Sequence, residues 1–406
     1  MPKILRIINR FNLGGPTYNA AYLSKYMPAD YETMLVGGEK DDTEATSLFI
    51  VNQLGIEPII IPTMKRSLNF TNDYSAYNKI KELIKEFKPD IVHTHASKAG
   101  FLGRLAAHNL NVPIILHTFH GHVFHSYFNS ASTLVYKNLE RYMAKRSHGI
   151  IAISERQKHE LAHEHKICPE DKIKVIPLGF DLDKFQTNMD EKRKSFRERY
   201  NIDDDEIAIV IIGRLVPIKN HNLFIEAIKK VNEKTSKKIR AFIVGDGEER
   251  NNLEEKAKSL NLKISDGSIG SEKSTLTFTS WIKDADIANA GADIIALSSL
   301  NEGTPVSLIE AQAASNPIVS TLVGGIENVV IANETALLSE KNDLEGFTEN
   351  LLKLIEDEDL RKKMSRLGAS FVSEKFHYNR LINDMSTYYE ELMKSKVKSK
   401  HSVSNS

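Results

Sequence analysis

The stretch "ADIIALSSLNEGTPVSLIEAQAASNPIVST" (292–321) contains a complete strand–helix–strand unit. Its first run, 292–299, and its last, 317–321, are largely apolar and predict buried strands. Between them, Thr304 is a good N-cap residue and Pro305 suits the first position of a helix. Consecutive strands joined by a helix pair in parallel, so this stretch predicts one unit of a parallel sheet that helices cover.

Similar apolar runs recur along the whole chain, and helix-like stretches separate them. The first half has seven such runs: 4–9, 32–38, 57–62, 90–95, 113–121, 149–154 and 173–179. The second half has five: 208–213, 239–245, 276–281, 292–299 and 317–321. The pattern predicts the α/β class, with two doubly wound, Rossmann-like domains of similar size. The polar, mixed-charge segment 180–206 between them is typical of a linker.

The composition is that of an ordinary globular protein of two or three domains, with 406 residues, 41% of them hydrophobic. The formal net charge is zero, which argues against nucleic acid as a partner. Cys168 is the only cysteine, so an internal disulfide is excluded and a cytoplasmic location is expected. The polar tail 394–406 is expected to fray. Its lysines would allow only weak peripheral contact with anionic lipid at the inner face of the cytoplasmic membrane.

Two glutamates in the opening stretch are candidates for binding a ligand. Glu302 lies in the turn after a predicted strand, and Glu310 lies on the second turn of the next helix. Open α/β sheets bind ligands beyond the carboxyl ends of their strands, where both carboxylates would lie. A carboxylate accepts hydrogen bonds from vicinal hydroxyls, as on a ribose or a hexose. The helical neighbours of Glu310 are apolar or small, so its carboxylate should be largely buried and should need a partner.

Two cations follow the strand predicted at 208–213. The segment "GRLVPIKN" (213–220) turns at Gly213 and then opens a helix, with Arg214 and Lys219 close to the helix N-terminus. A helix N-terminus flanked by cations suits a phosphate group, so phosphate binding is expected here.

The order of these motifs resembles that of a known enzyme family. Segment 213–219 follows G-R-L-x-x-x-K, the glutamates follow E-x7-E (302–310), and a glycine pair precedes an acidic residue at 324–327. Together with "GFDLDKF" (179–185), these motifs closely resemble the retaining nucleotide-sugar glycosyltransferases of family 4, which have the GT-B fold. The resemblance covers nearly the whole chain.

This resemblance implies roles for residues of the second half. Arg214 and Lys219 correspond to the pair that holds the donor diphosphate. Glu310 corresponds to the glutamate that binds the ribose hydroxyls, and Glu302 to the catalytic-site glutamate that contacts the transferred sugar. Backbone amides after this first glutamate also hold the donor in the family.

The chain departs from the family pattern at those amides. Pro305 has no N–H to donate, whereas the family commonly has E-G-F-G at this point. We expect the amides of Thr304 and Val306 and the Thr304 hydroxyl to bind the donor in its place.

In the first half, the resemblance covers two loops that follow strands. The segment "NLGGP" (12–16) matches the family's glycine-rich loop and places Gly14 and Gly15 at the donor diphosphate. The segment "HTFHGHVFH" (117–125) matches the strand end at which a histidine lies close to the donor sugar, and His120 is the best candidate for that catalytic role.

The resemblance also predicts the domain organisation. The stretch 375–393 is amphipathic and resembles the C-terminal helix that crosses back to the first domain in GT-B enzymes. The acceptor-binding domain would then consist of residues 1–180 plus 376–406, and the nucleotide-sugar-binding domain of residues 181–375. In this fold the two domains face a cleft.

The expected activity is transfer of a hexose or N-acetylhexosamine, with retention, from a nucleoside-diphosphate sugar. A UDP-sugar is the first candidate for the donor. Segments 97–107 and 117–124 are similar to those of bacterial surface-polysaccharide and lipid-linked-sugar transferases, so the expected acceptor is a cell-envelope glycan or a lipid-linked sugar. No cofactor or essential metal is expected, because Arg214, Lys219 and a helix N-terminus would stabilise the leaving diphosphate.

Several alternatives stay open at the level of sequence. A GT-B-fold epimerase would convert a nucleotide sugar without an acceptor, and a phosphorylase would need a cofactor lysine for which we find no motif. A catalytically inactive protein could still bind a nucleotide or a glycan. A membrane scaffold would bind lipid whether or not nucleotide is present.

A zinc site is a further alternative. The segment "HELAH" (159–163) follows the H-E-x-x-H pattern, and seven of the 14 histidines lie between His93 and His125. The charged neighbours of HELAH indicate a solvated helix. Histidines at buried strand ends are more often neutral and hydrogen-bonded than bound to metal. We therefore predict that no metal binds.

Overall fold

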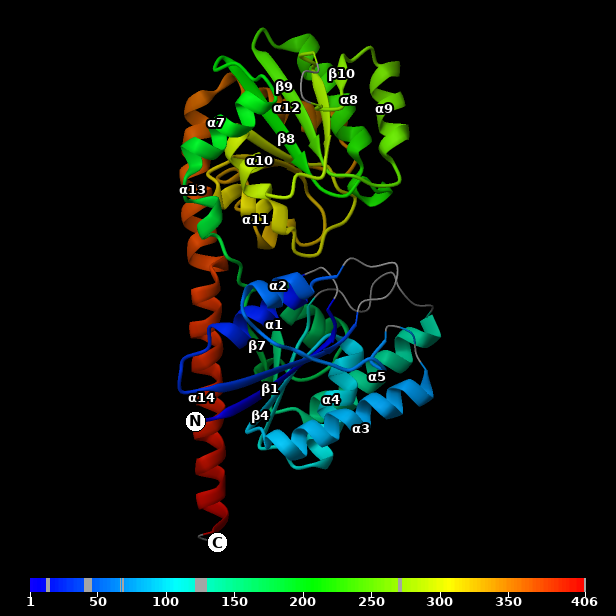
Figure 1. Cartoon of the computed structure of the whole chain (residues 1–406), viewed down its shortest axis with the longest axis vertical. Coiled ribbons are helices and arrows are strands. Elements are labelled where there is room, and N and C mark those ends of the chain that lie inside the picture. Colours follow the sequence, from blue (N-terminus) through cyan, green and yellow to red (C-terminus); the bar gives the residue numbers. More distant parts are fainter. Residues whose placement is uncertain are drawn as a thin grey trace. The chain divides into compact units, whose positions relative to one another are not determined.

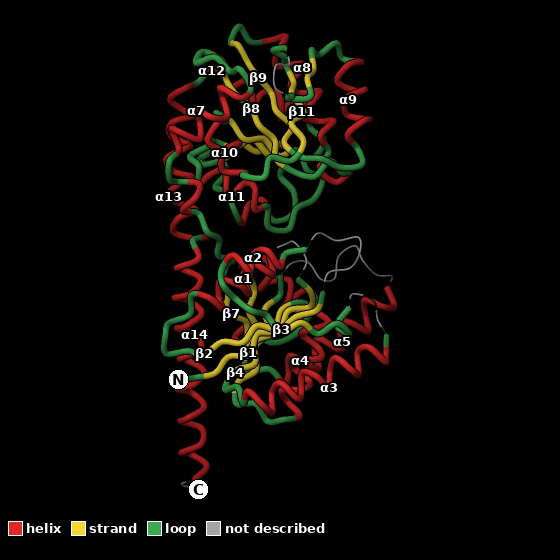
Figure 2. The backbone as a smooth tube through the Cα atoms, viewed as in Figure 1, coloured by secondary structure: helices red, strands yellow, loops and turns green. Residues whose placement is uncertain are grey.

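The computed structural model divides into two compact units, Met1–Phe180 with Phe376–Ser406 (unit 1) and Asp181–Lys375 (unit 2). It describes residues 1–11, 15–39, 46–65, 67, 69–120, 130–268 and 272–404, without the side chains of 130–132 and 397–404. Figures 1 and 2 show a sheet covered by helices in each unit. In the described part of the chain, no helix is long and apolar enough to cross a membrane.

Unit 1 is built on a parallel sheet of seven strands in the order β3-β2-β1-β4-β5-β6-β7. The strands are β1 (Lys3–Arg10), β2 (Glu32–Gly38), β3 (Ile59–Ile60), β4 (Ile91–His95), β5 (Ile114–Thr118), β6 (Gly149–Ala152) and β7 (Ile173–Val175). The helices are α1 (Gly15–Lys25), α2 (Leu48–Gln53), α3 (Phe70–Phe87), α4 (Ser97–Asn109), α5 (Ser130–Arg146), α6 (Glu155–His159), η1 (Glu160–Glu164), η2 (Glu170–Lys172) and α14 (Tyr378–Ser404). The strand order reverses between β1 and β4, so the loops after these strands lie at the topological switch point.

Alternation along β1 explains why helices cover both faces of this sheet. Leu5 packs with α3 and α4 on one face, whereas Ile4 packs with α1 and α14 on the other. Arg6 is fully buried, and its Nη1 donates to the Tyr389 hydroxyl of α14 at 2.7 Å. Its Nη2 donates to the Leu23 carbonyl of α1 at 2.8 Å. The last helix of the chain is therefore part of the core of unit 1.

Unit 2 repeats this architecture with the strand order β10-β11-β9-β8-β12-β13-β14, and every pairing is parallel. The strands are β8 (Glu206–Ile212), β9 (Lys238–Val244), β10 (Ile264–Ser265), β11 (Leu276–Ser280), β12 (Ile294–Leu297), β13 (Ile318–Thr321) and β14 (Ala336–Ser339). The helices are η3 (Asp183–Phe185), α7 (Met189–Arg199), η4 (Pro217–Lys219), α8 (His221–Lys234), α9 (Arg250–Ser259), α10 (Ala285–Gly291), α11 (Val306–Ala313), η5 (Ile326–Asn328), α12 (Leu344–Glu356) and α13 (Glu358–Phe376). Its switch point lies between β8 and β12.

The segment 180–206, interpreted above as a linker, belongs instead to unit 2 from Asp181 onward. It contains α7, which packs on α10 and buries Phe196 against Phe242 at a ring-centroid distance of 5.4 Å. Arg193 and Arg197 of this helix donate to the Asp293 carboxylate at 2.7 and 3.2 Å. The helix is held by one aromatic ring and by ion pairs, so it lacks the apolar stripe that marks a packed helix in a sequence.

Three further differences concern short or terminal elements. The two-residue strand β10 and the strand β14 were not predicted. The tail, expected to fray, is helical as far as Ser404 because α14 continues without interruption from Tyr378.

Candidate active site

The loops after β8 and β12 bring together two of the predicted site residues of unit 2. These strands are hydrogen-bonded neighbours, so their carboxyl ends lie side by side. Lys219 ends the short turn η4 after β8, and its Nζ donates to Glu302 Oε1, after β12, at 2.5 Å. The Ser299 hydroxyl donates to the same carboxylate oxygen at 2.6 Å. The sequence motifs predict Lys219 and Glu302 as site residues, but they do not predict that the two side chains pair.

Two glycines fix the loop that carries Glu302. The Gly325 N–H donates to the Glu302 carbonyl at 2.9 Å. A Cβ added at Gly324 would lie 2.0 Å from that carbonyl oxygen, and one added at Gly325 would lie 1.7 Å from the Gly303 carbonyl oxygen. Such distances are far below van der Waals contact, so this contact between loops requires the glycine pair at 324–325.

Arg214 lies at the same end of the sheet, two residues after β8 ends. Its side chain is exposed, and among the residues that the structure describes it has no ion pair. Of the two predicted phosphate ligands, Lys219 is therefore held by Glu302, whereas Arg214 is open to an anion.

The helix α11 begins at Val306, so Pro305 occupies the N-cap position and no side chain caps the helix. The prediction that Thr304 is the N-cap and Pro305 the first helical residue is wrong by one residue. Pro305 has a ψ of 96°, an extended rather than helical conformation, so the helix can begin only after it. Within the described residues no side chain caps this helix, so its first turn keeps free N–H groups that an anion can bind.

Glu310 lies on the second turn of α11, as predicted. Burial raises the pKa of Glu310 to about 7; Lys184 opposes this rise, and Asp286 adds to it. Within the described ranges, no donor forms a hydrogen bond with this carboxylate. A largely buried carboxylate without a donor is costly to ionise, and two ligand hydroxyls would relieve that cost.

In unit 1, His120 follows β5 and contacts a histidine that the sequence analysis did not single out. Its Nε2 lies 2.8 Å from Nδ1 of His95, the last residue of β4. Burial lowers the pKa of His120 to about 3 and that of His95 well below its ordinary value, so both rings are neutral at physiological pH. His120 Nδ1 and His95 Nε2 are buried without a partner in the described residues, and each can therefore still bind a ligand group.

The neighbouring histidines are neutral and hydrogen-bonded, as interpreted from the sequence. His93 Nδ1 and Nε2 lie 2.7 Å from the hydroxyls of Tyr389 and Thr118, respectively. His117 Nδ1 lies 2.8 Å from the Thr94 hydroxyl. Burial lowers the pKa of both histidines well below the ordinary value. Within the described ranges, no group of three or more His, Cys, Asp or Glu side chains could hold a metal ion.

The HELAH segment is less solvated than the sequence suggested. The His159 and His163 rings are neighbours, with centroids 4.7 Å apart. Glu160, however, is buried and pairs with Arg156 at 3.1 Å. The glutamate that would act as the base in a zinc protease is thus engaged in an ion pair.

The glycine-rich loop of unit 1 is only partly described. Gly14 lies outside the described residues, as does the part of the 117–125 segment after His120. Gly15 is the first residue of α1, and a Cβ added there would make an ordinary contact of 3.4 Å with Leu178. Steric crowding therefore does not explain Gly15.

One exposed aromatic residue of unit 2 was missed. Trp281 directly follows β11 and is 57% exposed at the carboxyl edge of the sheet. Exposed aromatic rings at such an edge can stack on a nucleobase. Its position at the end of the predicted strand 276–281, as the only tryptophan of the chain, was the available signal.

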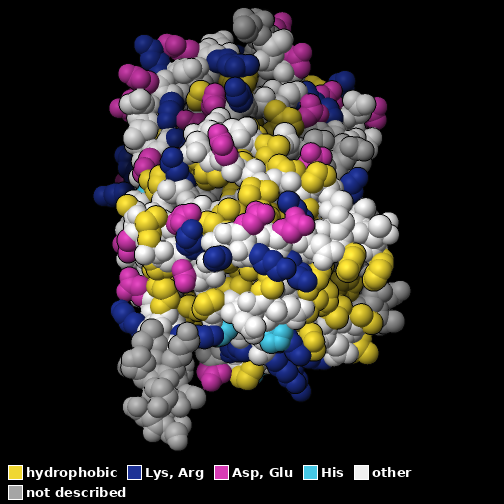
Figure 3. Space-filling view, turned by 60° about the horizontal axis from the view of Figure 1, so that its bottom comes forward, with side chains coloured by type: hydrophobic (Ala, Val, Ile, Leu, Met, Phe, Trp, Pro, Cys, Tyr) yellow, Lys and Arg dark blue, Asp and Glu magenta, His cyan; other side chains and the backbone are white. Residues whose placement is uncertain are grey.

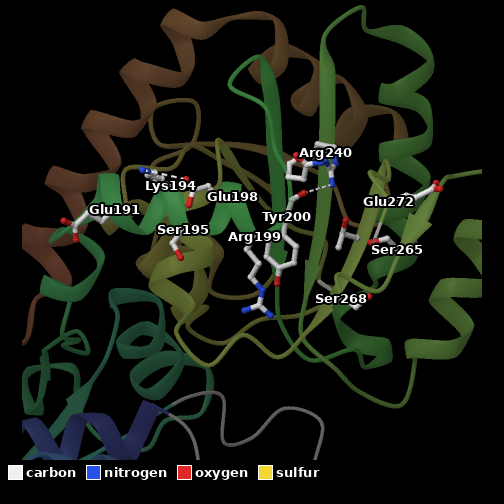
Figure 4. A pocket seen from close by; sticks show the side chains of 12 residues that line it. Glu191, Lys194, Ser195, Glu198, Arg199, Tyr200, Arg240, Ser265, Ser268 and Glu272 are labelled. Carbon is white, nitrogen blue, oxygen red and sulfur yellow. Dashed lines mark hydrogen bonds and ion pairs between the residues drawn. The ribbon is translucent and has the colours of Figure 1, made fainter. Parts of the chain in front are cut away.

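A cavity of about 810 Å³ in unit 2 lies away from these loops (Figure 4). It lies beside the N-terminal parts of β9 and β11, where Arg240 and Thr277 line it, and Arg240 donates to the Tyr200 carbonyl at 3.2 Å. None of the predicted site residues lines this cavity. Because ligands of such sheets bind at the opposite, carboxyl end, we do not assign the donor to it.

Comparisons with known proteins give the family. Residues 192–370 match the family described as glycosyl transferases group 1, and residues 13–184 match glycosyltransferase family 4. An Escherichia coli protein named UDP-Gal:alpha-D-GlcNAc-diphosphoundecaprenol alpha-1,3-galactosyltransferase is 31% identical over 347 residues, 84% of this chain and 85% of that protein. The capsular polysaccharide biosynthesis glycosyltransferase CapM of Staphylococcus aureus is 26% identical over 339 residues, 82% of this chain and 85% of that protein.

Solved structures show the same fold. A glycosyltransferase from Rickettsia africae superposes with a TM-score of 0.76 at 21% identity, covering 97% of this chain and 99% of that one. Anabaena HepE, solved in complex with UDP, has a TM-score of 0.78 at 17% identity and covers 96% of this chain and 100% of that one. Two Rossmann-like sheets, together with these matches, define a glycosyltransferase of the GT-B class. The chain belongs to glycosyltransferase family 4.

Proposed function

We propose that the chain transfers a hexosyl or N-acetylhexosaminyl residue from a UDP-sugar to a lipid-linked sugar, with retention and without a metal ion or cofactor. The pairing of Lys219 with Glu302 at the switch point of unit 2, with Glu310 on the adjoining helix, carries the proposal. The name of the E. coli relative specifies UDP-Gal and a GlcNAc-diphosphoundecaprenol acceptor, and UDP-galactose is therefore the first donor to test. Such an acceptor would bring the enzyme to the inner face of the cytoplasmic membrane.

The cations of unit 2 would stabilise the leaving group. When UDP departs, negative charge builds up on its β-phosphate, and Arg214 and Lys219 supply two positive charges after β8. The uncapped N-terminus of α11 adds a partial positive charge. Together these groups account for leaving-group stabilisation without a metal ion.

The two glutamates would have separate roles. Glu310 would accept hydrogen bonds from the two ribose hydroxyls, which stabilises its ionised form. Glu302 holds Lys219 in place and would share this ammonium with the incoming diphosphate while it contacts the transferred sugar. Glu302 would therefore affect turnover more than nucleotide affinity.

Retention is what the resemblance to the family implies, and without an evident protein nucleophile among the described residues of the diphosphate site it fits front-face attack. The anomeric carbon takes on oxocarbenium character as UDP leaves. The acceptor hydroxyl would attack from the face that UDP leaves, and the departing phosphate would take its proton. The resemblance assigns His120 to the transferred sugar, where its neutral imidazole would form a hydrogen bond rather than an ion pair.

Thermal shift with a panel of nucleoside diphosphates and their sugars tests the donor. UDP and one UDP-sugar are expected to raise the melting temperature, because a ligand that binds only the folded state stabilises it. No shift with any nucleotide would contradict the proposal. Incubation with the nucleotide sugar alone tests the alternative activity, since an isomerised sugar formed without an acceptor would identify an epimerase.

A further inference from the structure

Unit 1 contains a cavity of about 700 Å³ between the helices α3, α4 and α5. Each helix contributes residues spaced three or four positions apart, so one face of each helix lines the cavity. The apolar lining includes Phe70, Tyr74 and Tyr77 of α3, Phe101 and Leu105 of α4, and Leu139 of α5. The volume is within the range of about 300–1,000 Å³ that is usual for small-molecule sites.

Large apolar side chains are also exposed at its rim. Phe70 is 87% exposed and Tyr74 is 60% exposed, and their rings stack at a centroid distance of 6.4 Å. Leu134 and Val135 of α5 do not line the cavity and are each more than half exposed. Figure 3 shows hydrophobic side chains gathered toward the right of the view, the side on which Figure 1 draws α3, α4 and α5. Exposed apolar patches of this kind mark binding surfaces.

The charged side chains of the cavity wall are engaged with other protein groups. Glu140 accepts from Arg104 at 2.6 Å, and this pair is almost fully buried. Asp73 pairs with Lys98, whose ammonium also donates to the Lys65 carbonyl at 2.8 Å. A ligand would therefore meet mainly aromatic and aliphatic surface, which favours a hydrocarbon over a sugar or a nucleotide.

The cavity reaches the edge of the sheet that carries the candidate catalytic histidine. Asn9 and Arg10, the last residues of β1, line it together with Ser97 and Lys98, the first residues of α4. The strand β4 ends at His95, the hydrogen-bond partner of His120, just before α4 begins. Among the residues that the structure describes, no side chain caps the N-terminus of α4, which makes this end of the cavity polar. An amphiphile with its chain in the cavity would have its polar end at the switch point of unit 1.

We propose that this cavity binds the first isoprenoid units of a lipid-linked acceptor, those nearest to its diphosphate. The inference rests on the proposed function and names the part of the acceptor that the enzyme would recognise. The volume holds only a section of a long polyprenyl chain, so the remainder would stay in the membrane. A short prenyl group would fill the cavity incompletely and would bind more weakly.

Direct binding tests the cavity without requiring catalysis. The probe is geranylgeranyl diphosphate carrying a fluorescent label, which has no sugar, and its binding to the full chain is followed by fluorescence anisotropy. Leu105→Gln places an amide in the lining and is expected to raise the Kd at least about ten-fold, as expected for loss of a buried leucine contact. The matched control Leu134→Gln, on the exposed surface outside the cavity, is expected to leave the Kd within about two-fold of wild type.

Equal effects of the two substitutions, or no effect of Leu105→Gln, would overturn the proposal. If Leu105→Gln does not fold, Phe70→Ser replaces it, because a side chain this exposed is not needed for folding. Phe70→Ser is then expected to weaken probe binding at least about three-fold, since only part of the ring contacts the chain. An unchanged Kd in this variant would also overturn the proposal.

Kinetics with two acceptors provides a second test. Both carry the same sugar diphosphate, one on a geranylgeranyl chain and one on a short prenyl group. Leu105→Gln is expected to raise the KM of the long-chain acceptor about ten-fold while the KM values of the short-chain acceptor and the UDP-sugar stay unchanged. Equal KM increases for both acceptors would overturn the proposal. If neither acceptor is used by wild type, the proposed function fails, and the binding experiment still decides about the cavity.

Sedimentation with vesicles of phosphatidylethanolamine and phosphatidylglycerol separates a chain-binding cavity from a general membrane contact. Leu105→Gln is expected to sediment like wild type, because the exposed surface outside the cavity is intact. If it loses vesicle binding and probe binding to the same extent, the apolar surface faces the membrane as a whole and the proposal is overturned. The proposal is also overturned if the free wild-type protein sediments as a dimer and the Leu105→Gln variant sediments as a monomer.

Discussion

Lys219 and Glu302 are 83 residues apart in the sequence, and their side chains meet at 2.5 Å beside the ends of β8 and β12. The pair is partly exposed, with 24% of the lysine side chain and 11% of the glutamate side chain accessible. Glu302 thus holds a cation at the place where the donor diphosphate is expected, and the two residues should act as a coupled unit.

Lys219→Ala is expected to weaken UDP binding about ten- to 100-fold, because charge-assisted hydrogen bonds to a phosphate are lost. Glu302→Gln should lower kcat more than it changes the Kd of UDP. In a double-mutant cycle on kcat/KM, the two substitutions should show a coupling of about 1 kcal/mol or more. Calorimetry and steady-state kinetics measure these values.

The matched control for this pair is Lys230→Ala, because Lys230 pairs with Glu345 elsewhere in unit 2. It should leave UDP binding unchanged. Unchanged binding in Lys219→Ala would show that the diphosphate assignment is wrong.

Glu310 should make nucleotide affinity depend on pH. Its pKa is raised to about 7, and ribose hydroxyls bind best to the ionised carboxylate. The affinity for a UDP-sugar should therefore be constant above pH 7 and should fall about ten-fold per pH unit as the pH drops below 7. A UDP-sugar is the right ligand, because its diphosphate is esterified at both ends and does not titrate in this range.

Glu310→Gln should remove this pH dependence and bind the UDP-sugar more weakly at pH 8.

Glu310→Gln should also stabilise the nucleotide-free protein. Because the folded-state pKa lies above the ordinary value of 4.5, ionisation destabilises the fold as the pH rises through this window. The variant is expected to be more stable than wild type by about 1–3 kcal/mol at pH 8 and equally stable near pH 4, as measured by urea unfolding.

His120→Ala is expected to lower kcat about ten- to 100-fold with little change in UDP affinity, because a hydrogen bond to the transferred sugar is lost. Burial lowers the pKa of His120 to about 3, so the ring does not titrate between pH 5 and pH 9. The pH profiles of wild type and His120→Ala should therefore have the same shape over this range. A limb near pH 6 that disappears in the variant would contradict the neutral assignment.

Local sequence patterns predict the helices and strands, whereas the order of the strands in each sheet determines which side chains meet. The spacing of Glu302 and Glu310 placed one in a loop and the other in a helix, and the structure agrees. The contact between Lys219 and Glu302 depends on β8 lying next to β12, which apolar periodicity does not reveal. His95 was overlooked for the same reason, since only the pairing of β4 with β5 places it beside His120.

Errors arose where packing does not leave a pattern in the sequence. The helix α7 was interpreted as a linker because ion pairs to Asp293, rather than a row of apolar residues, hold it in place. The start of α11 was misplaced by one residue because Pro305 is compatible with both the N-cap and the first helical position.

Ser315 offers a stability test that does not involve the ligand. It follows α11 with a φ of 60°, the left-handed region in which a Cβ is unfavourable. Ser315→Gly should raise the free energy of unfolding by about 0.5–1 kcal/mol, after allowance for the greater freedom of glycine in the unfolded chain. Urea unfolding measures the change. Ser315→Ala keeps the Cβ and should bring no gain; a gain with alanine would show that strain is not the cause.

Catalysis is expected to survive treatment with a metal chelator, because the cations of unit 2 are protein side chains. Activity of the purified enzyme after extensive dialysis against EDTA should match that of the untreated enzyme. His159→Ala should be equally active, since Glu160 of the HELAH segment pairs with Arg156. Loss of activity with EDTA that zinc restores would show that the metal-free mechanism is wrong.

The hydrogen bond from Arg6 to Tyr389 spans 383 residues, almost the full length of the chain. During synthesis, the ribosome releases the whole of Asp181–Lys375 before α14 can cover the remaining face of the first sheet. Unit 1, whose first strands are synthesised before unit 2, is therefore completed after it. Until then, the guanidinium of Arg6 lacks its phenol partner, and Ile4 and its neighbours stay open to chaperones and proteases. Chaperones and proteases should thus recognise nascent chains that are interrupted before α14 as unfinished, even though unit 2 of these chains has all of its residues.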